Sequence, residues 1–351
     1  MSEAVFQESS PGAVVRTTSR GTLIARHPTM RDALDVLDRV AGSTCTVLVT
    51  GESGTGKELA IAALHDRSPR RDAPLVAVNC GAIPENLVES ELFGHAKGAF
   101  TGATSARHGF VAAAAGGTLF LDEVGELPPL AQVKLLRLLQ TKEYTPVGET
   151  KPVKCDVRIV AATNRDLPAE VAKGTFREDL FYRLNVIHVH LPPLRERPGD
   201  VELLARHFLK CCAERTGRTD VVAFSPEALG RIAADPWHGN VRSLENAIER
   251  AVLLSPGEVI PADCIRLHSA SHVTPVYEPA PARVPASNAA IIDLRAAVEE
   301  YENTLIKSAL ERTGFNKSRA AQLLGLQRTT LVEMLKRKNI VAELPRLPRA
   351  A

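Results

Sequence analysis

Short apolar runs alternate with helical patterns between Thr46 and Pro192. The runs are rich in β-branched residues and lie at 46–50, 75–80, 117–123, 157–163 and 186–192. Strands that alternate with helices along a chain predict a parallel sheet between helical layers. The runs are almost continuously apolar, which is the pattern of strands buried on both faces. We therefore expect an α/β domain whose sheet is covered on both sides.

The pattern becomes helical after Pro192. Ser225 followed by Pro226 is a typical helix start, and a further helix is expected to begin near Asn240. A segment rich in Pro and Ala then indicates a semi-rigid linker before helical spacing returns. We predict a tail at 1–21, an α/β domain at 22–195, an all-helical lid at 196–268, a linker at 269–290, a helical domain at 291–341 and a tail at 342–351.

Composition bounds the class of protein without identifying it. The 351 residues suffice for two or three folded units, and 44% hydrophobic with 24% charged residues is typical of a soluble globular chain. The formal net charge is only +2, so a nucleic-acid partner requires a local basic surface. The chain shows no basic-then-apolar leader and no run near the roughly 18 apolar residues of a membrane span. We expect a cytoplasmic protein with no membrane partner.

A glycine-rich loop follows the first apolar run and opens a helical pattern. In this context the loop N–H groups surround phosphates and the lysine reaches the terminal phosphates. The expected cofactors are therefore ATP and Mg²⁺. Glu58 stands where the general motif has Ser or Thr, so the usual hydroxyl ligand of magnesium is missing. The predicted nucleotide-binding residues are Gly51, Glu52, Ser53, Gly54, Thr55, Gly56, Lys57 and Glu58.

Two adjacent carboxylates end the buried run at 117–123. Burial of charge is costly without a cation or a partner. Asp122 is therefore predicted to bind magnesium, directly or through water, and Glu123 to polarise the water that attacks the terminal phosphate. An exposed acidic pair at a strand end is the alternative, which the preceding phosphate loop disfavours.

With these motifs, GAFTGA at 98–103 and FREDLFYRLNV at 176–186, the chain resembles the sigma-54 activator branch of the AAA+ ATPases over residues 22–268. The resemblance implies that GAFTGA tips a surface loop that contacts the sigma-54 factor. Its glycines suit hinges, Phe100 suits an apolar anchor and Thr101 a hydrogen-bonding tip. The predicted contact residues are Gly98, Ala99, Phe100, Thr101, Gly102 and Ala103.

The resemblance also implies roles for two asparagines and three arginines. Asn164 matches a sensor of the terminal phosphate, and Asn79 matches an asparagine that pairs with Glu123 and couples nucleotide state to the loop. Arg177 and Arg183 match paired arginines that enter the ATP site of the neighbouring subunit. Arg242 matches an arginine of the lid that senses the nucleotide.

The arginines have an alternative interpretation, and the sequence differs from the family pattern at several positions. Either Arg177 or Arg183, taken alone, could form a surface salt bridge with Glu178 or Asp179. His238 and Ser243 stand where the family's WPGNVREL has Pro and Glu, which predicts a looser lid that keeps its arginine. LIARHPTM at 23–30 replaces the usual Ile-Gly-x-Ser segment and alters the contacts expected for the adenine base.

The basic surface that net charge conceals lies between Arg312 and Lys338. This segment contains seven basic residues and one acidic residue, Glu333. The segment reads as helix, tight turn at Gly325 and helix, and it resembles the Fis-like DNA-binding module. A solvated helical hairpin is the alternative. The residues predicted to contact double-stranded DNA, at base edges or phosphates, are Arg319, Gln327, Arg328, Thr329, Thr330, Lys336, Arg337 and Lys338.

These features predict a sigma-54-dependent transcription activator. We expect dimers that bind upstream DNA, a hexamer or heptamer ring, and ATP hydrolysis that remodels the sigma-54 RNA polymerase complex. Because only a short tail precedes residue 22, we expect no receiver domain, and regulation either by a separate protein or by expression level. The alternatives are a DNA-binding regulator that uses the AAA+ domain mainly as an oligomerisation scaffold, and a motor acting on polypeptides. Lys57, Asp122 and Glu123 disfavour the first alternative, and the helix-turn-helix disfavours the second.

Overall fold

The structure, a computed structural model, describes residues 13–100, 103, 105–265 and 294–338. The chain divides into two compact units, Met1–His272 and Val273–Ala351. The expected linker at 269–290 and the tail at 342–351 lie outside the described residues. Among the described helices, none is long and apolar enough to cross a membrane.

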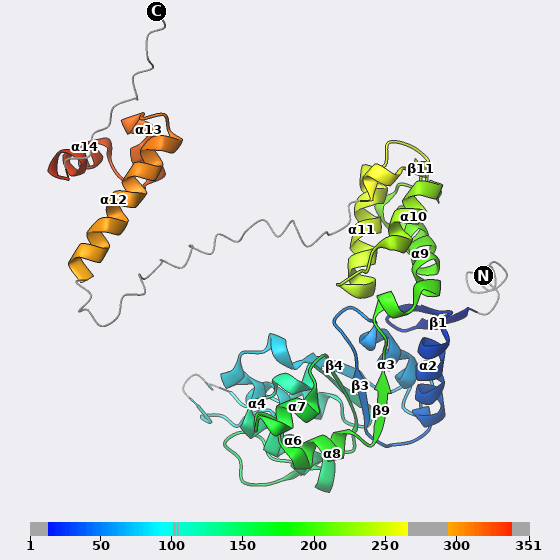
Figure 1. Ribbon diagram of the computed structural model, residues 1–351. Coiled ribbons are helices and arrows are strands. Elements are labelled where there is room, and N and C mark those ends of the chain that lie inside the picture. Colours follow the sequence, from blue (N-terminus) through cyan, green and yellow to red (C-terminus); the bar gives the residue numbers. More distant parts are fainter. Residues whose placement is uncertain (1–12, 101–102, 104, 266–293, 339–351) are drawn as a thin grey trace, which may run out of the picture. The chain divides into compact units, whose positions relative to one another are not determined.

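A five-stranded parallel sheet forms the centre of the first unit, in the order β4-β5-β8-β3-β9; Figure 1 labels β3, β4 and β9. Its strands are β3 (Val47–Thr50), β4 (Leu75–Asn79), β5 (Thr118–Asp122), β8 (Arg158–Thr163) and β9 (Ile187–His190). Successive side chains of a strand point to opposite faces. In β5, Leu119 and Leu121 pack into one hydrophobic cluster and Phe120 into another. This burial on both faces confirms the predicted α/β class.

Helices supply the other side of each cluster. The cluster that holds Phe120 is closed by α2 (Pro28–Ala41) and α3 (Lys57–Asp66). The opposite cluster is closed mainly by α4 (Glu85–Phe93), α6 (Pro129–Thr141) and α8 (Glu178–Leu184). The shorter elements in this part of the chain are α5 (Phe110–Ala113), β6 (Glu143–Tyr144), β7 (Val153–Lys154) and α7 (Leu167–Ala172).

A hairpin precedes α2, where the sequence predicts a tail up to residue 21. β1 (Val14–Thr18) pairs antiparallel with β2 (Gly21–Ala25). Alternation along β2 sends Leu23 and Ala25 into the α/β core and Ile24 into the core of the lid. β1 escapes prediction because its polar centre has no clear period, and a distant partner stabilises it instead: buried Arg16 donates to Asp38 of α2 at 2.5 Å.

The lid comprises α9 (Pro198–Thr216), α10 (Pro226–Ala234) and α11 (Asn240–Leu254). The Ser225 hydroxyl accepts a hydrogen bond from the Ala228 N–H at 3.1 Å, which confirms the predicted N-cap. Two short strands, β10 (Ala223–Phe224) and β11 (Val259–Ile260), pair in parallel beside the helices. The prediction of an all-helical lid lacked this small sheet, because two-residue strands carry no periodicity.

The second unit has a core of its own. It contains α12 (Leu294–Arg312), α13 (Lys317–Leu323) and α14 (Arg328–Arg337). Buried alanines at 320 and 321 pack against Leu331 and Leu335, as the sequence predicts. Asn316 caps α13 by accepting from the N–H groups of Ser318 and Arg319, and Gly325 takes the left-handed φ of +66° in the turn. The unit is a helix-turn-helix.

Arg158 explains how a cation fits at the start of a buried strand. Its side chain is 2% exposed, and its guanidinium donates to the carbonyls of Ala41 at 2.8 Å and Val40 at 2.9 Å. These carbonyls lie at the end of α2, where helix geometry supplies no i+4 donor. The Val40 carbonyl also accepts from the Ser43 N–H at 3.1 Å, so Arg158 caps α2 chiefly by pairing with the Ala41 carbonyl.

We predict that Arg158→Met lowers the free energy of unfolding by about 1–3 kcal/mol, because it leaves the Ala41 carbonyl without its donor and removes a charged donor from the Val40 carbonyl. Urea unfolding followed by circular dichroism measures the loss. Arg137→Met, at an exposed position of α6, is the control and should change stability little. Equal stability of the two variants would contradict the capping role.

Candidate functional site

The phosphate loop joins β3 to α3 and depends on its glycines. Gly54 has φ +78°, and a Cβ atom there would lie 2.4 Å from the Gly239 carbonyl oxygen of the lid. A Cβ at Gly51 would lie 2.7 Å from the Leu191 carbonyl oxygen. Real Cβ atoms do not approach so closely, so only glycine fits at either position. The loop therefore places its backbone N–H groups at the start of α3, where helix geometry favours phosphate.

Lys57 is a buried cation in the first turn of α3. Its ammonium donates to the carbonyls of Gly51 at 2.8 Å and Glu52 at 3.2 Å, and it lies 3.9 Å from the Glu123 carboxylate. Burial lowers the pKa of Lys57, and the charges of Glu123 and Asp122 oppose that shift. The loop carbonyls and Glu123 thus aim the ammonium at the space in front of the phosphate loop.

Asp122 and Glu123 end β5 beside this lysine. Both line a cavity of about 550 Å³ together with Lys57 and Asn79. One Asp122 oxygen, Oδ1, is buried and has no hydrogen-bond partner among the described residues. Burial, followed by the charge of Glu123, raises the pKa of Asp122. An orphaned buried carboxylate oxygen next to a phosphate loop fits a magnesium ion, which supplies the missing charge.

Two asparagines flank the acidic pair. The Asn164 N–H donates to the Glu123 carboxylate at 3.2 Å, which orients that carboxylate. Asn79 does not form the expected pair with Glu123 among the described contacts. Its side-chain oxygen accepts from the N–H groups of Gly81 at 3.0 Å and Ala82 at 3.2 Å, so it caps the turn after β4. The turn therefore fixes the Asn79 amide through its oxygen, whereas a pair with the Glu123 carboxylate would need its NH₂ group.

The lid grips the phosphate loop through polar contacts that sequence reasoning missed. The Arg195 guanidinium makes two hydrogen bonds to the Glu52 carboxylate, at 2.6 and 2.8 Å. Buried Asn240 donates to Glu52 at 3.1 Å and to the Ser53 carbonyl at 3.0 Å, and accepts from the Leu194 N–H at 2.7 Å. Arg197, 1% exposed, donates to the Thr55 carbonyl at 3.0 Å. We call the contacts of Arg195 and Asn240 with the Glu52 carboxylate the Glu52 clamp. The two arginines on either side of Glu196 are the sequence feature that could have indicated contacts with the phosphate loop.

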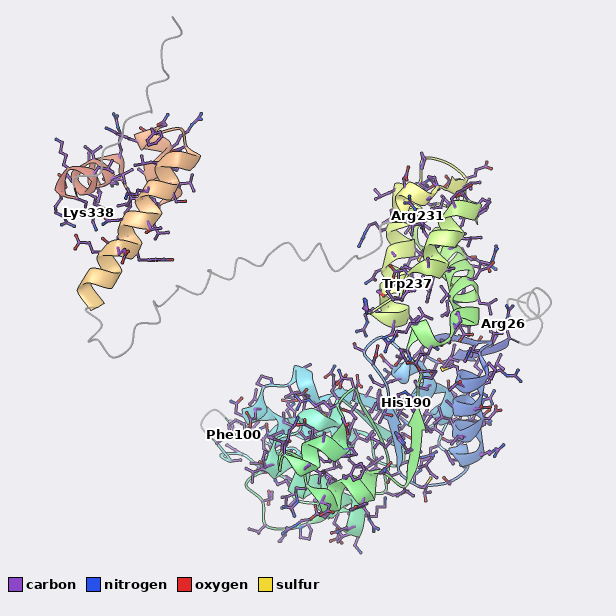
Figure 2. The ribbon with its side chains drawn as sticks, in the orientation of Figure 1. Arg26, Phe100, His190, Arg231, Trp237 and Lys338 are labelled. Atoms are coloured by element: carbon purple, nitrogen blue, oxygen red, sulfur yellow. The ribbon has the colours of Figure 1, made fainter. Side chains whose placement is uncertain are left out.

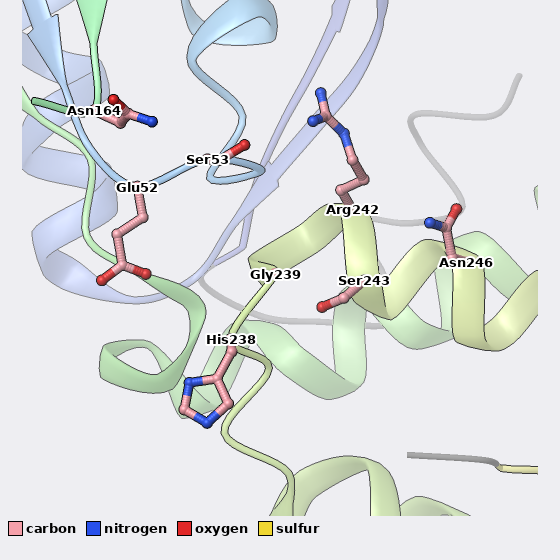
Figure 3. A pocket seen from close by; sticks show the side chains of 8 residues that line it. All are labelled: Glu52, Ser53, Asn164, His238, Gly239, Arg242, Ser243 and Asn246. Carbon is pink, nitrogen blue, oxygen red and sulfur yellow. The ribbon is translucent and has the colours of Figure 1, made fainter. Parts of the chain in front are cut away.

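Arg242 lies on α11 at the edge of the phosphate loop. Arg242, Ser243, Ser53 and Asn164 line a cavity of about 600 Å³, and Figure 3 shows their side chains. Arg242 also lines the cavity around Lys57. Ser243, one of the departures from the family sequence, donates to the Asn240 carbonyl at 2.8 Å inside the first turn of α11. The structure thus brings the predicted lid arginine to the nucleotide cavity.

The other predicted arginines lie elsewhere. Arg177 and Arg183 are exposed at α8, and neither lines the cavity around Lys57. Arg177 makes two hydrogen bonds to Asp179, at 3.0 and 2.7 Å. The salt bridge left open by the sequence is therefore present in the single chain, and Arg177 does not serve the chain's own phosphate loop.

The GAFTGA segment is described at Gly98, Ala99, Phe100 and Ala103, while Thr101 and Gly102 lie outside the described residues. The Gly98 N–H donates to the Ala103 carbonyl at 2.8 Å, and Gly98 has φ +81°. Phe100, labelled in Figure 2, is 40% exposed, and its ring meets the His95 ring edge-on with centroids 5.0 Å apart. An apolar ring is thus held at the surface by a loop that closes on its own backbone.

The basic residues of the helix-turn-helix are mostly exposed. Gln327, Arg328, Thr329 and Thr330 form the start of α14 with their side chains exposed, as are Arg319, Lys336 and Arg337. Lys338 differs: its side chain is 4% exposed and its ammonium lies 2.7 Å from Glu302 of α12 (Figure 2). The structure does not support the expected phosphate contact for Lys338, because an intramolecular carboxylate already holds it.

Three families match successive parts of the chain. They are the Sigma-54 interaction domain at residues 23–190, the AAA+ ATPase lid domain at 195–275, and the bacterial regulatory protein, Fis family, at 297–337.

Curated relatives and solved structures match over most of the chain. Transcriptional regulatory protein ZraR of Escherichia coli (strain K12) is 46% identical over 92% of this chain and 70% of its own length. DNA-binding transcriptional regulator NtrC of Azospirillum brasilense is 47% identical over 91% of this chain and 69% of its own. NtrX from Brucella abortus, crystallised with ATP, is 34% identical, with a TM-score of 0.65 over 93% of this chain and 71% of that chain.

The Glu52 clamp predicts a pH-dependent stability. Hydrogen bonds from Arg195 and then Asn240 lower the Glu52 pKa from 4.5 to about 2. A depressed pKa contributes stability that is present above pH about 4.5 and is lost as pH falls toward about 2. Because the Glu52 side chain is 43% exposed, water screens the pair, and we expect about 1 kcal/mol. Glu52→Gln should therefore be less stable than the native chain at pH 7, and the difference should shrink below pH about 4.5.

Urea unfolding at a series of pH values measures this difference. Glu149→Gln, at an exposed loop carboxylate, is the control and should track the native chain at every pH. A difference between native and Glu52→Gln that stays constant down to pH 3 would rule out the clamp as its source.

Proposed function

The chain belongs to the sigma-54-dependent transcription activators, with an ATP-binding AAA+ domain and a Fis-type helix-turn-helix, and on that basis we propose that it hydrolyses ATP to remodel a sigma-54 RNA polymerase complex at promoters near its DNA sites. The observation that carries the proposal is the Lys57, Asp122 and Glu123 constellation at the phosphate loop. A domain kept only as an oligomerisation scaffold has no need for a buried, unpaired carboxylate oxygen beside a buried lysine.

Each part of this constellation has a chemical task. The loop N–H groups and the Lys57 ammonium bind the phosphates of ATP, and Asp122 would hold Mg²⁺, which would supply positive charge against the phosphates. The Glu123 carboxylate accepts the proton of the attacking water. The backbone N–H of Asn164 donates to this carboxylate at 3.2 Å and holds it in place. Arg242 contacts the nucleotide from the lid, so that lid position and nucleotide state depend on each other.

A second subunit completes the site. In this proposal the exposed Arg177 and Arg183 enter the cavity of a neighbouring copy, where a guanidinium stabilises charge in the transition state. Arg177 must first exchange its bond to Asp179 for the phosphate oxygens. Hydrolysis is therefore coupled to assembly of a ring of six or seven copies, built from DNA-bound dimers.

The output of hydrolysis is movement of the GAFTGA loop. Phe100 presents an apolar surface suited to a protein partner, and the loop carries no titratable group of its own. The helix-turn-helix holds the ring near its promoter through Arg319, the start of α14, Lys336 and Arg337. The partners are the sigma-54 factor, RNA polymerase and double-stranded DNA.

We predict that Lys57→Ala lowers ATP hydrolysis by about two orders of magnitude or more, because it removes the cation that stabilises the terminal phosphates. DNA binding should be unchanged, since the helix-turn-helix forms a separate unit. A phosphate-release assay and a DNA mobility shift measure the two activities. Lys173→Ala, at an exposed lysine of the α/β domain, should retain both. Loss of DNA binding together with hydrolysis in Lys57→Ala would contradict the separation of the two functions.

We predict that Thr101→Ala spares ATP hydrolysis and abolishes promoter opening, because the threonine acts on the partner rather than on the nucleotide. Open-complex formation on a sigma-54 promoter in a purified system, with ATP and with a non-hydrolysable analogue, is the measurement. Thr104→Ala, the same substitution just outside the hexapeptide, is the control and should still open the promoter. Loss of hydrolysis in Thr101→Ala would assign the loop to the catalytic site. An absence of ATP-dependent opening by the native chain would overturn the proposed function.

A further inference from the structure

The tip of the β1–β2 hairpin forms part of the wall of the nucleotide cavity. Arg20, Gly21 and Thr22 line this cavity together with Lys57 and Asp122. The Arg20 guanidinium forms an ion pair with the Glu58 carboxylate. Arg20 also lies ahead of residues 23–190, which match the sigma-54 interaction domain. An arginine outside that match thus contacts the last residue of the phosphate-loop motif.

The hairpin tip is fixed on α3 by several contacts. The backbone N–H and the hydroxyl of Ser19 donate to the Asp66 carboxylate at 2.8 and 3.1 Å, at the last residue of α3. The Arg20 N–H donates to the Thr18 hydroxyl at 3.1 Å. A Cβ atom at Gly21 would lie 3.2 Å from the Leu59 side chain. Arg20 is therefore presented to the first turn of α3 by a backbone that is already held.

Charge in the cavity shows what this arginine does. The ammonium and guanidinium groups that line it belong to Lys57, Arg242 and Arg20, and the carboxylates belong to Asp122, Glu123, Glu58 and Glu245. Carboxylates therefore outnumber these cations, although the ligand is itself an anion. Glu58 adds to the imbalance because it replaces the hydroxyl residue of the general motif and directly follows Lys57. A free carboxylate at that position repels the phosphates that the loop must bind.

We infer that Arg20 is a positioning residue of the nucleotide site: its ion pair with Glu58 neutralises that carboxylate and holds it away from the phosphates of ATP. Arg20 acts through Glu58 and not on the nucleotide itself. This inference rests on the proposed function, because it takes the phosphate loop to bind ATP. It also gives Glu58 a partner in the protein, and leaves Asp122 as the carboxylate for magnesium.

The test is a double-mutant cycle in the full chain, with ATP binding measured by isothermal titration calorimetry. Arg20→Ala should weaken ATP binding about fivefold, as expected for loss of a solvent-exposed ion pair and exposure of a like charge. Arg20→Lys should stay close to native because it keeps the charge. In the double variant Arg20→Ala with Glu58→Gln, affinity should return to that of Glu58→Gln alone, since no carboxylate is left to neutralise.

Salt and magnesium provide a readout that a merely structural role does not move. The Arg20→Ala defect should be larger in EDTA than with Mg²⁺, because uncomplexed ATP carries more negative charge. It should shrink at 0.5 M salt, where charges are screened over a shorter distance. Arg39→Ala, at an exposed arginine of α2 outside the cavity, is the matched control and should bind ATP as the native chain does. Arg20→Gln carries the same expectation and replaces Arg20→Ala if truncation unfolds the hairpin.

Unchanged affinity in Arg20→Ala and Arg20→Gln would overturn the inference. So would a double variant as weak as Arg20→Ala, because that result assigns Arg20 to direct contact with the nucleotide or to the fold. Failure of the native chain to bind ATP at all is a different result, which overturns the proposed function and this inference with it.

Discussion

The closeness of the phosphate loop to the lid is the constraint on which the nucleotide site depends. Gly54 lies so near the Gly239 carbonyl that a methyl group does not fit, and the Val241 N–H donates to the Gly54 carbonyl at 2.9 Å. Asn240 lies between these two lid residues in the sequence, and its side-chain amide donates to the Glu52 carboxylate and to the Ser53 carbonyl. The loop therefore keeps its shape only while the start of α11 stays in contact with it, and a change at the phosphates has to be matched by the lid.

A second chain of contacts carries the same constraint toward the N-terminal hairpin. Buried Arg197 donates to the Thr55 carbonyl and lies 3.9 Å from Asp200. The Asp200 carboxylate accepts from the N–H groups of Arg26 at 2.6 Å and His27 at 2.8 Å, directly after β2 (Figure 2 labels Arg26). Buried groups of this kind are costly to leave unpaired. Since Ile24 of β2 also packs in the lid core, the hairpin, the lid and the phosphate loop are tied together.

What the sequence predicts well is what short segments determine. The five buried strands, the phosphate loop, the Ser225 cap and the core of the helix-turn-helix follow from periodicity and from motifs a few residues long. What it misses are pairs between distant residues: Glu52 with Arg195, Arg20 with Glu58, and Lys338 with Glu302. A charged residue reads the same in a sequence whether it meets water, DNA or a carboxylate 36 positions away. For Asn79 the motif identified the residue, but not that the turn after β4 holds its side-chain oxygen.

The charges of the site explain why a single chain is poorly equipped for the proposed hydrolysis. Lys57 is already bound to two loop carbonyls and lies near Glu123, and Arg20 is committed to Glu58. The other arginine that lines the cavity is Arg242, which lies on the lid and is not paired with Glu58. Arg177, which matches the family's motif for contacting phosphate, is not among the residues that line the cavity and is bound to Asp179. In the proposed mechanism an arginine of another copy supplies the extra cation that a phosphoryl-transfer transition state requires, which would link turnover to assembly.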